Sequence, residues 1–104
     1  MLTEKDYCDY ETCVALKELG YPVIMAYGNP SIEIHLYDAQ KWLREKKNIQ
    51  IEIPIAFMDN GVWKFSFRIQ TPEFYDRAIG EWDSYEEALL EGIKEAIKIL
   101  KEEK

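Results

Sequence analysis

Residues 84–101 carry a pattern that few structures other than an amphipathic α-helix can satisfy. Ser84 and Glu87 have the spacing of a capping box, in which each side chain bonds the other residue's backbone amide, and Asp83 with Glu86 is a shifted alternative. Apolar or small residues then recur every three or four positions, at Tyr85, Ala88, Leu89, Gly92, Ile93, Ala96, Ile97 and Leu100. This spacing predicts a helix over 85–101 that is buried along one side.

Two segments ahead of this helix, residues 49–57 and 62–70, have a large apolar residue at nearly every odd position. Alternation with a period of two predicts the strands of a half-buried sheet. Asp59, Asn60 and Gly61 join the segments and predict a β-hairpin, with Gly61 in the left-handed conformation.

The loop length of this hairpin decides which residues face each other. A two-residue loop at Asn60 and Gly61 pairs Phe57 with Lys64, which sets an apolar face beside a polar one. Because the buried face sets the register, a three-residue loop is predicted instead. The expected pairs are Met58 with Val62, Phe57 with Trp63, Ile55 with Phe65, Ile53 with Phe67, and Ile51 with Ile69.

The apolar face of the hairpin is expected to pack on the C-terminal helix. Gly92 lies on the buried face of that helix, where a glycine costs about 1 kcal/mol relative to alanine. A bulky neighbour is therefore expected there, with Trp63 or Phe65 as the candidates. Pro54 has no amide hydrogen, which predicts that the first strand lies at the edge of the sheet.

A first helix is predicted from Asp9, a residue that accepts amide hydrogens at helix starts, to Gly20, which suits a left-handed helix end. Thr3 is an alternative start. If Asp9 is the cap, Cys8 and Cys13 have the spacing of a hydrophobic staple.

A second helix is predicted over 36–47, ended by Asn48. Residues 21–27 are a candidate third strand, and 71–81 are expected to form a loop. The inner stripe of the second helix consists of Leu36, Ala39, Leu43 and, as a further candidate, Trp42. The fold class is α+β, with helices packed on one face of a small antiparallel sheet in the order α-(β)-α-β-β-α, in a single domain spanning 1–104.

Composition narrows the class of protein. Apolar residues make up 47% of the 104 residues, which indicates a folded chain, and the formal net charge of −7 opposes binding to nucleic acid or anionic membranes. No apolar run approaches the roughly 20 residues that cross a bilayer, and the N-terminus is charged where a signal peptide would be apolar. A soluble cytoplasmic protein without a membrane partner is expected.

The residues that carry chemistry are few. His35 is the only histidine, and it is expected at the start of the second helix without an anchored catalytic partner. Cys8 and Cys13 have no basic neighbour to lower a thiol pKa, so they are expected in the core. No catalytic residue, metal site or cofactor is predicted.

Aromatic residues are abundant, with seven Tyr, four Phe and three Trp. Tyr27, Tyr37, Phe74 and Tyr75 have no evident place in the core, and exposed aromatic residues are typical of protein interfaces. These four residues are the candidate binding residues. A basic cluster, Lys41, Arg44, Lys46 and Lys47, is interpreted as a solvated helix end balanced by Asp38 and Glu45.

Three segments in this order resemble a family of small uncharacterised proteins from gut bacteria and their phages or mobile elements. The segments read DYETCVALKELGY at 9–21, LYDAQKWLRE at 36–45, and SYEEAL at 84–89 followed by GIKEA at 92–96. The resemblance implies a mobile-element context, and no activity or functional residue comes with it.

Three functional hypotheses follow. The first is a non-catalytic binding or accessory protein of phage or mobile-element type that contacts a protein partner or a second copy of itself. The second is an acidic inhibitor that mimics the charge of nucleic acid. The third is a small enzyme that uses His35 with Cys8 or Cys13.

Overall fold

The structure is a computed structural model that describes residues 7–22, 34–72, 75–77 and 81–102; at 55–59 and 75–77 the description is limited to the backbone. The helices in these ranges are α1 (Tyr10–Glu18), α2 (Leu36–Lys47) and α3 (Tyr85–Glu102). The strands are β1 (Gln50–Glu52), β2 (Ile55–Asp59), β3 (Val62–Phe65), β4 (Arg68–Gln70) and β5 (Tyr75–Arg77).

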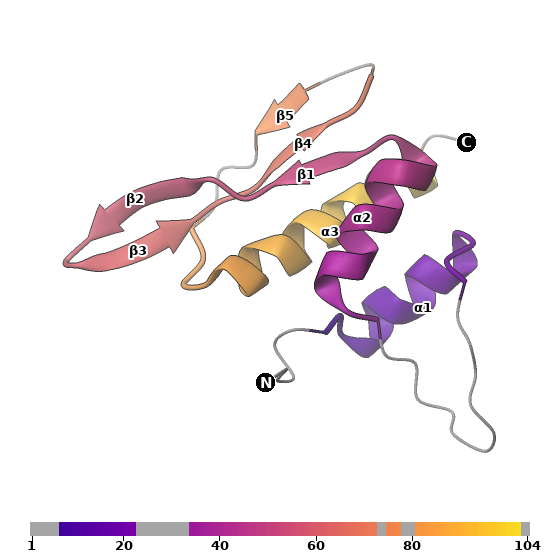
Figure 1. Cartoon of the computed structure of the whole chain (residues 1–104), viewed down its shortest axis with the longest axis horizontal. Coiled ribbons are helices and arrows are strands. Elements are labelled where there is room, and N and C mark those ends of the chain that lie inside the picture. Colours follow the sequence, from indigo (N-terminus) through magenta and orange to yellow (C-terminus); the bar gives the residue numbers. More distant parts are fainter. Residues whose placement is uncertain (1–6, 23–33, 73–74, 78–80, 103–104) are drawn as a thin grey trace.

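These elements form a small α+β fold, which confirms the predicted class. Strands β1, β4 and β5 make an antiparallel sheet in the order β1-β4-β5, and β2 and β3 form a separate two-stranded ribbon. Helix α3 packs on β1 and β4, α2 packs on α3 and β1, and α1 packs on α3 (Figure 1). The ribbon extends past the helices at one end of the molecule (Figure 1).

The closest packing lies between α3 and the sheet, at Gly92. A Cβ atom built on Gly92 would lie 2.8 Å from Cγ2 of Ile51 and 3.4 Å from the Phe67 side chain, so the helix approaches the sheet at a distance that only glycine allows. The prediction that Trp63 or Phe65 lies beside Gly92 is therefore wrong, because the neighbours are Ile51 and Phe67. The predicted buried face of α3 is confirmed at Ala88, Leu89, Gly92, Ile93, Ala96 and Ile97.

The predicted ends of α1 are also confirmed. The carboxylate of Asp9 accepts the backbone N–H of Thr12 at 2.8 Å, which satisfies one of the free amides of the first turn. Gly20 has a φ of +105°, and the Tyr21 N–H donates to the Leu16 carbonyl at 3.0 Å. This pattern closes the helix as a Schellman motif and turns the chain back toward α2.

Helix α2 has the predicted bounds, and it ends at Asn48 in a left-handed conformation with a φ of +57°. The Ser84 hydroxyl accepts the Glu87 N–H at 3.1 Å, which confirms Ser84 as the start of α3. The alternative start of the first helix at Thr3 and the candidate strand beyond Pro22 lie outside the described residues.

The turn of the ribbon differs from the prediction. Asp59 pairs with Val62, so the loop has two residues, and both Asn60 and Gly61 have positive φ values of +50° and +79°. This is the backbone of a type I′ turn, the favoured two-residue hairpin turn. The three-residue loop is therefore wrong, and Phe57 pairs with Lys64, not with Trp63.

A β-bulge reconciles this turn with the buried register. The pairing shifts by one residue between Ile55 and Phe57, after which Ile55 pairs with Phe65 and, further along, Ile51 pairs with Ile69, as predicted. One extra residue on β2 thus lets the local turn preference and the buried face both be satisfied. Ile53 and Phe67, which are also predicted to pair, lie outside the strands. Ile53 lies between β1 and β2, and Phe67 lies between β3 and β4.

Trp63 was expected in the core, and this is wrong, because its side chain is 49% exposed. Helix α3 begins at Tyr85, whose ring meets Phe65 at 6.4 Å. Alternation places Trp63 on the same face of β3 as Phe65 but one step nearer the turn. The ribbon extends past the N-terminal end of α3 (Figure 1), and α3 packs on β1 and β4, so Trp63 lies beyond the part of the sheet that the helix covers.

A second correction concerns residues 71–81, which were expected to form a loop. Residues 75–77 form β5, which pairs with β4 and makes β4 the central strand of the sheet. A three-residue strand is too short for an alternation signal. Its formation depends on the free edge that β4 offers.

The predicted edge position of the first strand is confirmed, since β1 is the outer strand of the sheet. The chain breaks its ladder at Pro54, whose carbonyl accepts the Ser66 N–H at 3.2 Å. On the outer edge, the Gln40 side chain donates to the Ile51 carbonyl at 2.7 Å.

None of the helices in the described ranges combines the length and the apolar character that a membrane-spanning segment needs.

Replacing Gly92 with Ala should destabilise the protein, although this change adds about 1 kcal/mol of helix propensity. The added methyl group must displace Ile51, and overpacking costs about 1–3 kcal/mol, so a net loss of about 1 kcal/mol is expected. Urea denaturation measures this, with exposed Lys98→Ala on the same helix as the near-neutral control. A stability gain for Gly92→Ala would contradict the close approach.

Asp9 links stability to pH. Burial raises the pKa of Asp9, but hydrogen bonds from Thr12 and Lys94 outweigh burial and hold the pKa below its ordinary value of 3.8. A carboxyl group with a lowered folded-state pKa adds stability above its unfolded pKa and loses this contribution as the pH falls through the folded value.

Asp9→Asn keeps a capping oxygen but loses the charge that faces Lys94 at 3.0 Å. It should therefore be less stable than the wild type at pH 7, and the gap should narrow as the pH falls through the folded-state pKa of Asp9. Asp9→Ala should lose about 1 kcal/mol more than Asp9→Asn throughout this pH range, because it has no cap. Urea denaturation at a series of pH values from 7 downward measures this, and a gap that does not change with pH would rule out the charge as its cause.

Candidate binding surfaces

Five rings from separate parts of the chain form a continuous series of contacts, here termed the aromatic row. Tyr7 meets His35 at 5.6 Å between ring centroids, His35 meets Tyr37 at 5.1 Å, Tyr37 meets Tyr85 at 6.0 Å, and Tyr85 meets Phe65 at 6.4 Å. Centroid separations in this range are typical of favourable aromatic pairs. The row therefore links the N-terminal segment, α2, α3 and the ribbon.

Backbone contacts hold both ends of the aromatic row in place. Tyr7 forms an isolated antiparallel bridge with His35, and the neighbouring Cys8 N–H donates to the Ile34 carbonyl at 2.8 Å. At the other end, Phe65 and Trp82 exchange two N–H to carbonyl hydrogen bonds of 2.9 Å each. The first bridge holds the N-terminal segment against the start of α2, and the second holds the base of the ribbon against the chain just ahead of α3.

The exposed parts of this surface lie at Tyr37 and on the ribbon. Tyr37 is 41% exposed, Trp63 is 49% exposed and Val62 is 52% exposed. Successive strand residues point to opposite faces, so Val62 and Trp63 place apolar side chains on the two faces of the ribbon. Tyr10 is also exposed, at 69%, but it has no ring contact among the described residues.

Only one of the four predicted binding residues can be placed with its side chain. Tyr37 lies in the aromatic row, Tyr75 contributes backbone to β5, and Tyr27 and Phe74 lie outside the described residues. Sequence reasoning missed Trp63, because its alternation is that of a core residue. Trp63 is exposed because the ribbon extends past the N-terminal end of α3 (Figure 1).

His35 and the cysteines have structural partners. Nδ1 of His35 accepts the Tyr37 N–H at 3.2 Å, so the imidazole is the N-cap of α2. Burial, followed by the neighbouring Cys13 and Asp9, raises the pKa of Cys8 to about 12. The Cys13 thiol donates to the Cys8 carbonyl at 3.6 Å, and both side chains are in the core, as expected.

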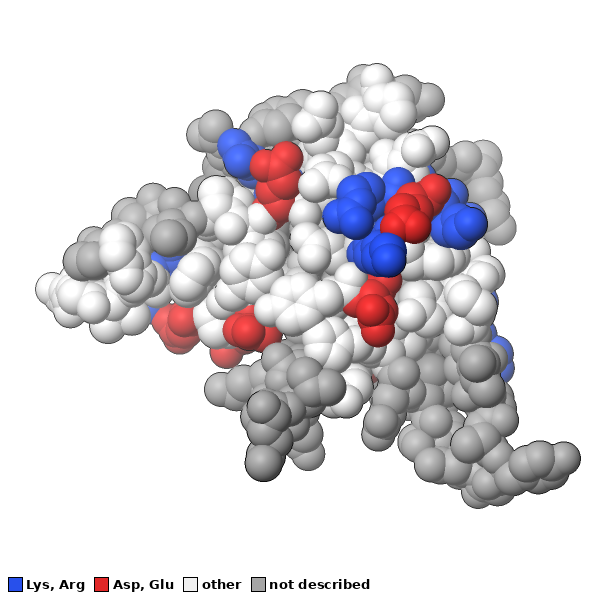
Figure 2. Space-filling view, in the orientation of Figure 1, with Lys and Arg blue, Asp and Glu red and all other residues white. Residues whose placement is uncertain are grey.

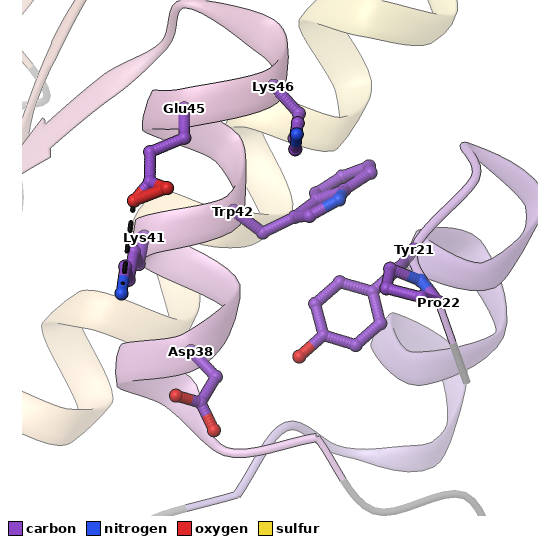
Figure 3. Close-up of a pocket in the computed structure, with 7 residues that line it drawn as sticks. All are labelled: Tyr21, Pro22, Asp38, Lys41, Trp42, Glu45 and Lys46. Atoms are coloured by element: carbon purple, nitrogen blue, oxygen red, sulfur yellow. Dashed lines mark ion pairs between the residues drawn. The ribbon is translucent and has the colours of Figure 1, made fainter. Parts of the chain in front are cut away.

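A cavity of about 240 Å³ lies between α2 and the turn that follows α1 (Figure 3). The rings of Tyr21 and Trp42 meet edge to face in it, with their centroids 5.4 Å apart and their planes at 65°. The cavity is lined by Tyr21, Pro22, Asp38, Lys41, Trp42, Glu45 and Lys46. Trp42 was predicted as a candidate core residue, and it is only partly buried.

A second hollow, of about 400 Å³, lies at the other end of α2. It is lined by Arg44, Asn48, Gln50, Gln70, Thr71 and Pro72 and has no aromatic residue among them. The C-terminal end of a helix carries partial negative charge, which opposes an anion that Arg44 would otherwise attract. The cavity at Trp42 is therefore the stronger candidate for a ligand-binding site.

Charges of both signs are mixed on the surface. Figure 2 shows Lys and Arg gathered over α2, with acidic side chains among them. Ion pairs in the described ranges join Lys41 to Glu45, Lys64 to Asp83, Arg68 to Glu52, Lys94 to Asp9 and to Glu91, and Lys101 to Glu18. The basic cluster of residues 41–47 thus has counter-charges beside it.

The described residues contain no group of three or more His, Cys, Asp or Glu side chains placed to hold a metal ion. The chain matches no protein-family model, no curated protein and no solved structure.

Burial of both cysteines should make them unreactive in the folded protein. A thiol reagent such as DTNB needs a thiolate, which the raised pKa of Cys8 and the 0% exposure of Cys13 disfavour. Both thiols should react quickly in 6 M guanidinium chloride but about a hundredfold more slowly in buffer at pH 8. Fast reaction of one thiol in buffer would contradict its placement in the core.

Proposed function

We propose that this chain is a non-catalytic binding protein, of the accessory type found with phages or mobile elements, that contacts a protein partner through the aromatic row and the ribbon. The partner is either another protein or a second copy of the chain. The resemblance of three sequence segments supports the accessory context, and the geometry of the rings supports the binding surface.

The observation that carries this proposal is the exposure of Trp63 beside a continuous series of aromatic contacts. Trp and Tyr dominate the binding energy of protein interfaces, because they bury a large area with few rotatable bonds. Half of the Trp63 surface faces solvent, although nothing in the packing of the core requires this. A side chain of this kind is expected to be covered by a partner.

The ribbon itself adds support. An isolated two-stranded hairpin is at best marginally stable in water, and this ribbon is held at its base by the bridge between Phe65 and Trp82. Among the described residues, the part of β3 between Phe65 and the turn pairs with β2 on one edge, and the proposal assigns its other edge to another chain. Main-chain pairing at this edge would align Val62 and Trp63 with a partner.

The non-catalytic part of the proposal is supported by the roles of the reactive residues. His35 uses Nδ1 to cap α2, and burial disfavours the thiolate form of Cys8. A nucleophile and base pair needs both groups free to exchange a proton. The proposal therefore assigns these residues to the scaffold.

A photo-crosslinking amino acid placed at residue 63 tests the binding surface. We expect it to form a discrete crosslinked product in the host cell or, for self-association, in the purified protein. The same amino acid at Tyr10, which is more exposed but outside the aromatic row, is the matched control and should give no discrete product.

Once a partner is identified, Trp63→Ala should weaken its binding by at least about tenfold, whereas Tyr10→Ala should leave it nearly unchanged. Both substitutions are at exposed sites and should alter the free energy of unfolding by less than about 1 kcal/mol. Equal crosslinking at residues 63 and 10, together with a monomer at all concentrations, would refute the proposal.

A further inference from the structure

The cavity between α2 and the turn that follows α1 combines two aromatic rings with a carboxylate. On α2, Asp38, Trp42 and Glu45 follow at helical spacing and line the same cavity. The left-handed turn at Gly20 brings Tyr21 against this face of α2, where its ring meets Trp42 at 5.4 Å. Figure 3 shows both rings and the Asp38 carboxylate bordering one space.

The two carboxylates of the cavity differ in their availability. Glu45 pairs with Lys41 at 4.0 Å, and this pair lies on the side of α2 away from Tyr21 in Figure 3. Asp38 has no ion pair among the described residues. Burial first, and the Asp38 charge second, raises the pKa of Tyr21, which places this negative charge close to the phenol.

Trp42 already attracts a cation. The ammonium group of Lys47 lies 5.5 Å from the centre of its ring, within the range of a cation–π contact. Lys47 does not line the cavity, whereas Lys46 does. The ring is thus in an environment that suits positive charge, and the cavity side is bordered by Tyr21 and Asp38.

We propose that this cavity binds a small organic cation with a quaternary trimethylammonium head group. Such a head has no N–H donors that require fixed acceptors, and it is less strongly hydrated than a primary ammonium, so two aromatic rings and one carboxylate suit it. A volume of about 240 Å³ accommodates one group of this size and not an extended ligand. This site shares no residue with the aromatic row, so it can be tested independently of the proposed protein-binding surface.

Titration of the intact protein with choline tests the proposal, with the indole N–H resonance of Trp42 followed by NMR. We expect saturable shifts of Trp42 with a Kd of about 1 mM, while Trp63 and Trp82 serve as internal controls that do not shift. Ethanolamine, the primary ammonium analogue, should bind several-fold more weakly. The neutral isostere 3,3-dimethylbutan-1-ol should bind more weakly still.

Three variants separate the contributions of the charged side chains of the cavity to choline binding. Asp38→Asn should weaken choline binding about tenfold, whereas Glu45→Gln, the matched loss of a carboxylate on the same helix, should have little effect. Lys46→Ala removes a rival cation from the rim and should tighten binding about two- to threefold. These residues are exposed, so the fold should be retained.

Three results would overturn the proposal. Shifts of Trp42 with the neutral alcohol equal to those with choline would indicate a merely apolar pocket. Equal binding of ethanolamine would remove the preference for a methylated head. The absence of a saturable shift at 50 mM choline would show that the cavity takes no cation of this class.

Discussion

Helix α3 lies so close to the sheet at Gly92 that a methyl group at this position would overlap Ile51. The helix backbone lies almost against Ile51 of β1 and Phe67, the residue just ahead of β4, and this contact accords with the register that pairs Ile51 with Ile69. Phe67 in turn packs on Trp82 at 5.3 Å, which sets the chain just ahead of α3. Trp82 also bridges Phe65 at the base of the ribbon, so the Gly92 contact is connected through Phe67 and Trp82 to the aromatic row.

Much of the fold could be predicted because its signals are local. The caps at Asp9 and Ser84, the helix ends at Gly20 and Asn48, and the buried face of α3 each depend on the chemistry of a few neighbouring residues, and all are confirmed. The hairpin shows where this reasoning ends. The turn and the core demand different registers, and sequence alone does not tell that a bulge satisfies both.

The candidate surfaces depended on features that are not local, so they could be predicted only in small part. Tyr37 was identified because it had no evident place in the core. Trp63 was missed, since its exposure results from where the ribbon lies relative to the start of α3. The corner of Tyr21 and Trp42 requires two helices to meet, and β5 requires the free edge of β4; neither juxtaposition leaves a signal in the residues themselves.

The hydrogen bond from Gln40 to the Ile51 carbonyl makes the two margins of the sheet unequal. A helix side chain occupies an acceptor on the β1 margin that an incoming strand would otherwise use, whereas β5 forms the opposite margin. Unwanted polymerisation by strand addition needs acceptors and donors on both margins of each molecule. By occupying one acceptor of the β1 margin, the Gln40 amide disfavours the addition of a strand at that margin.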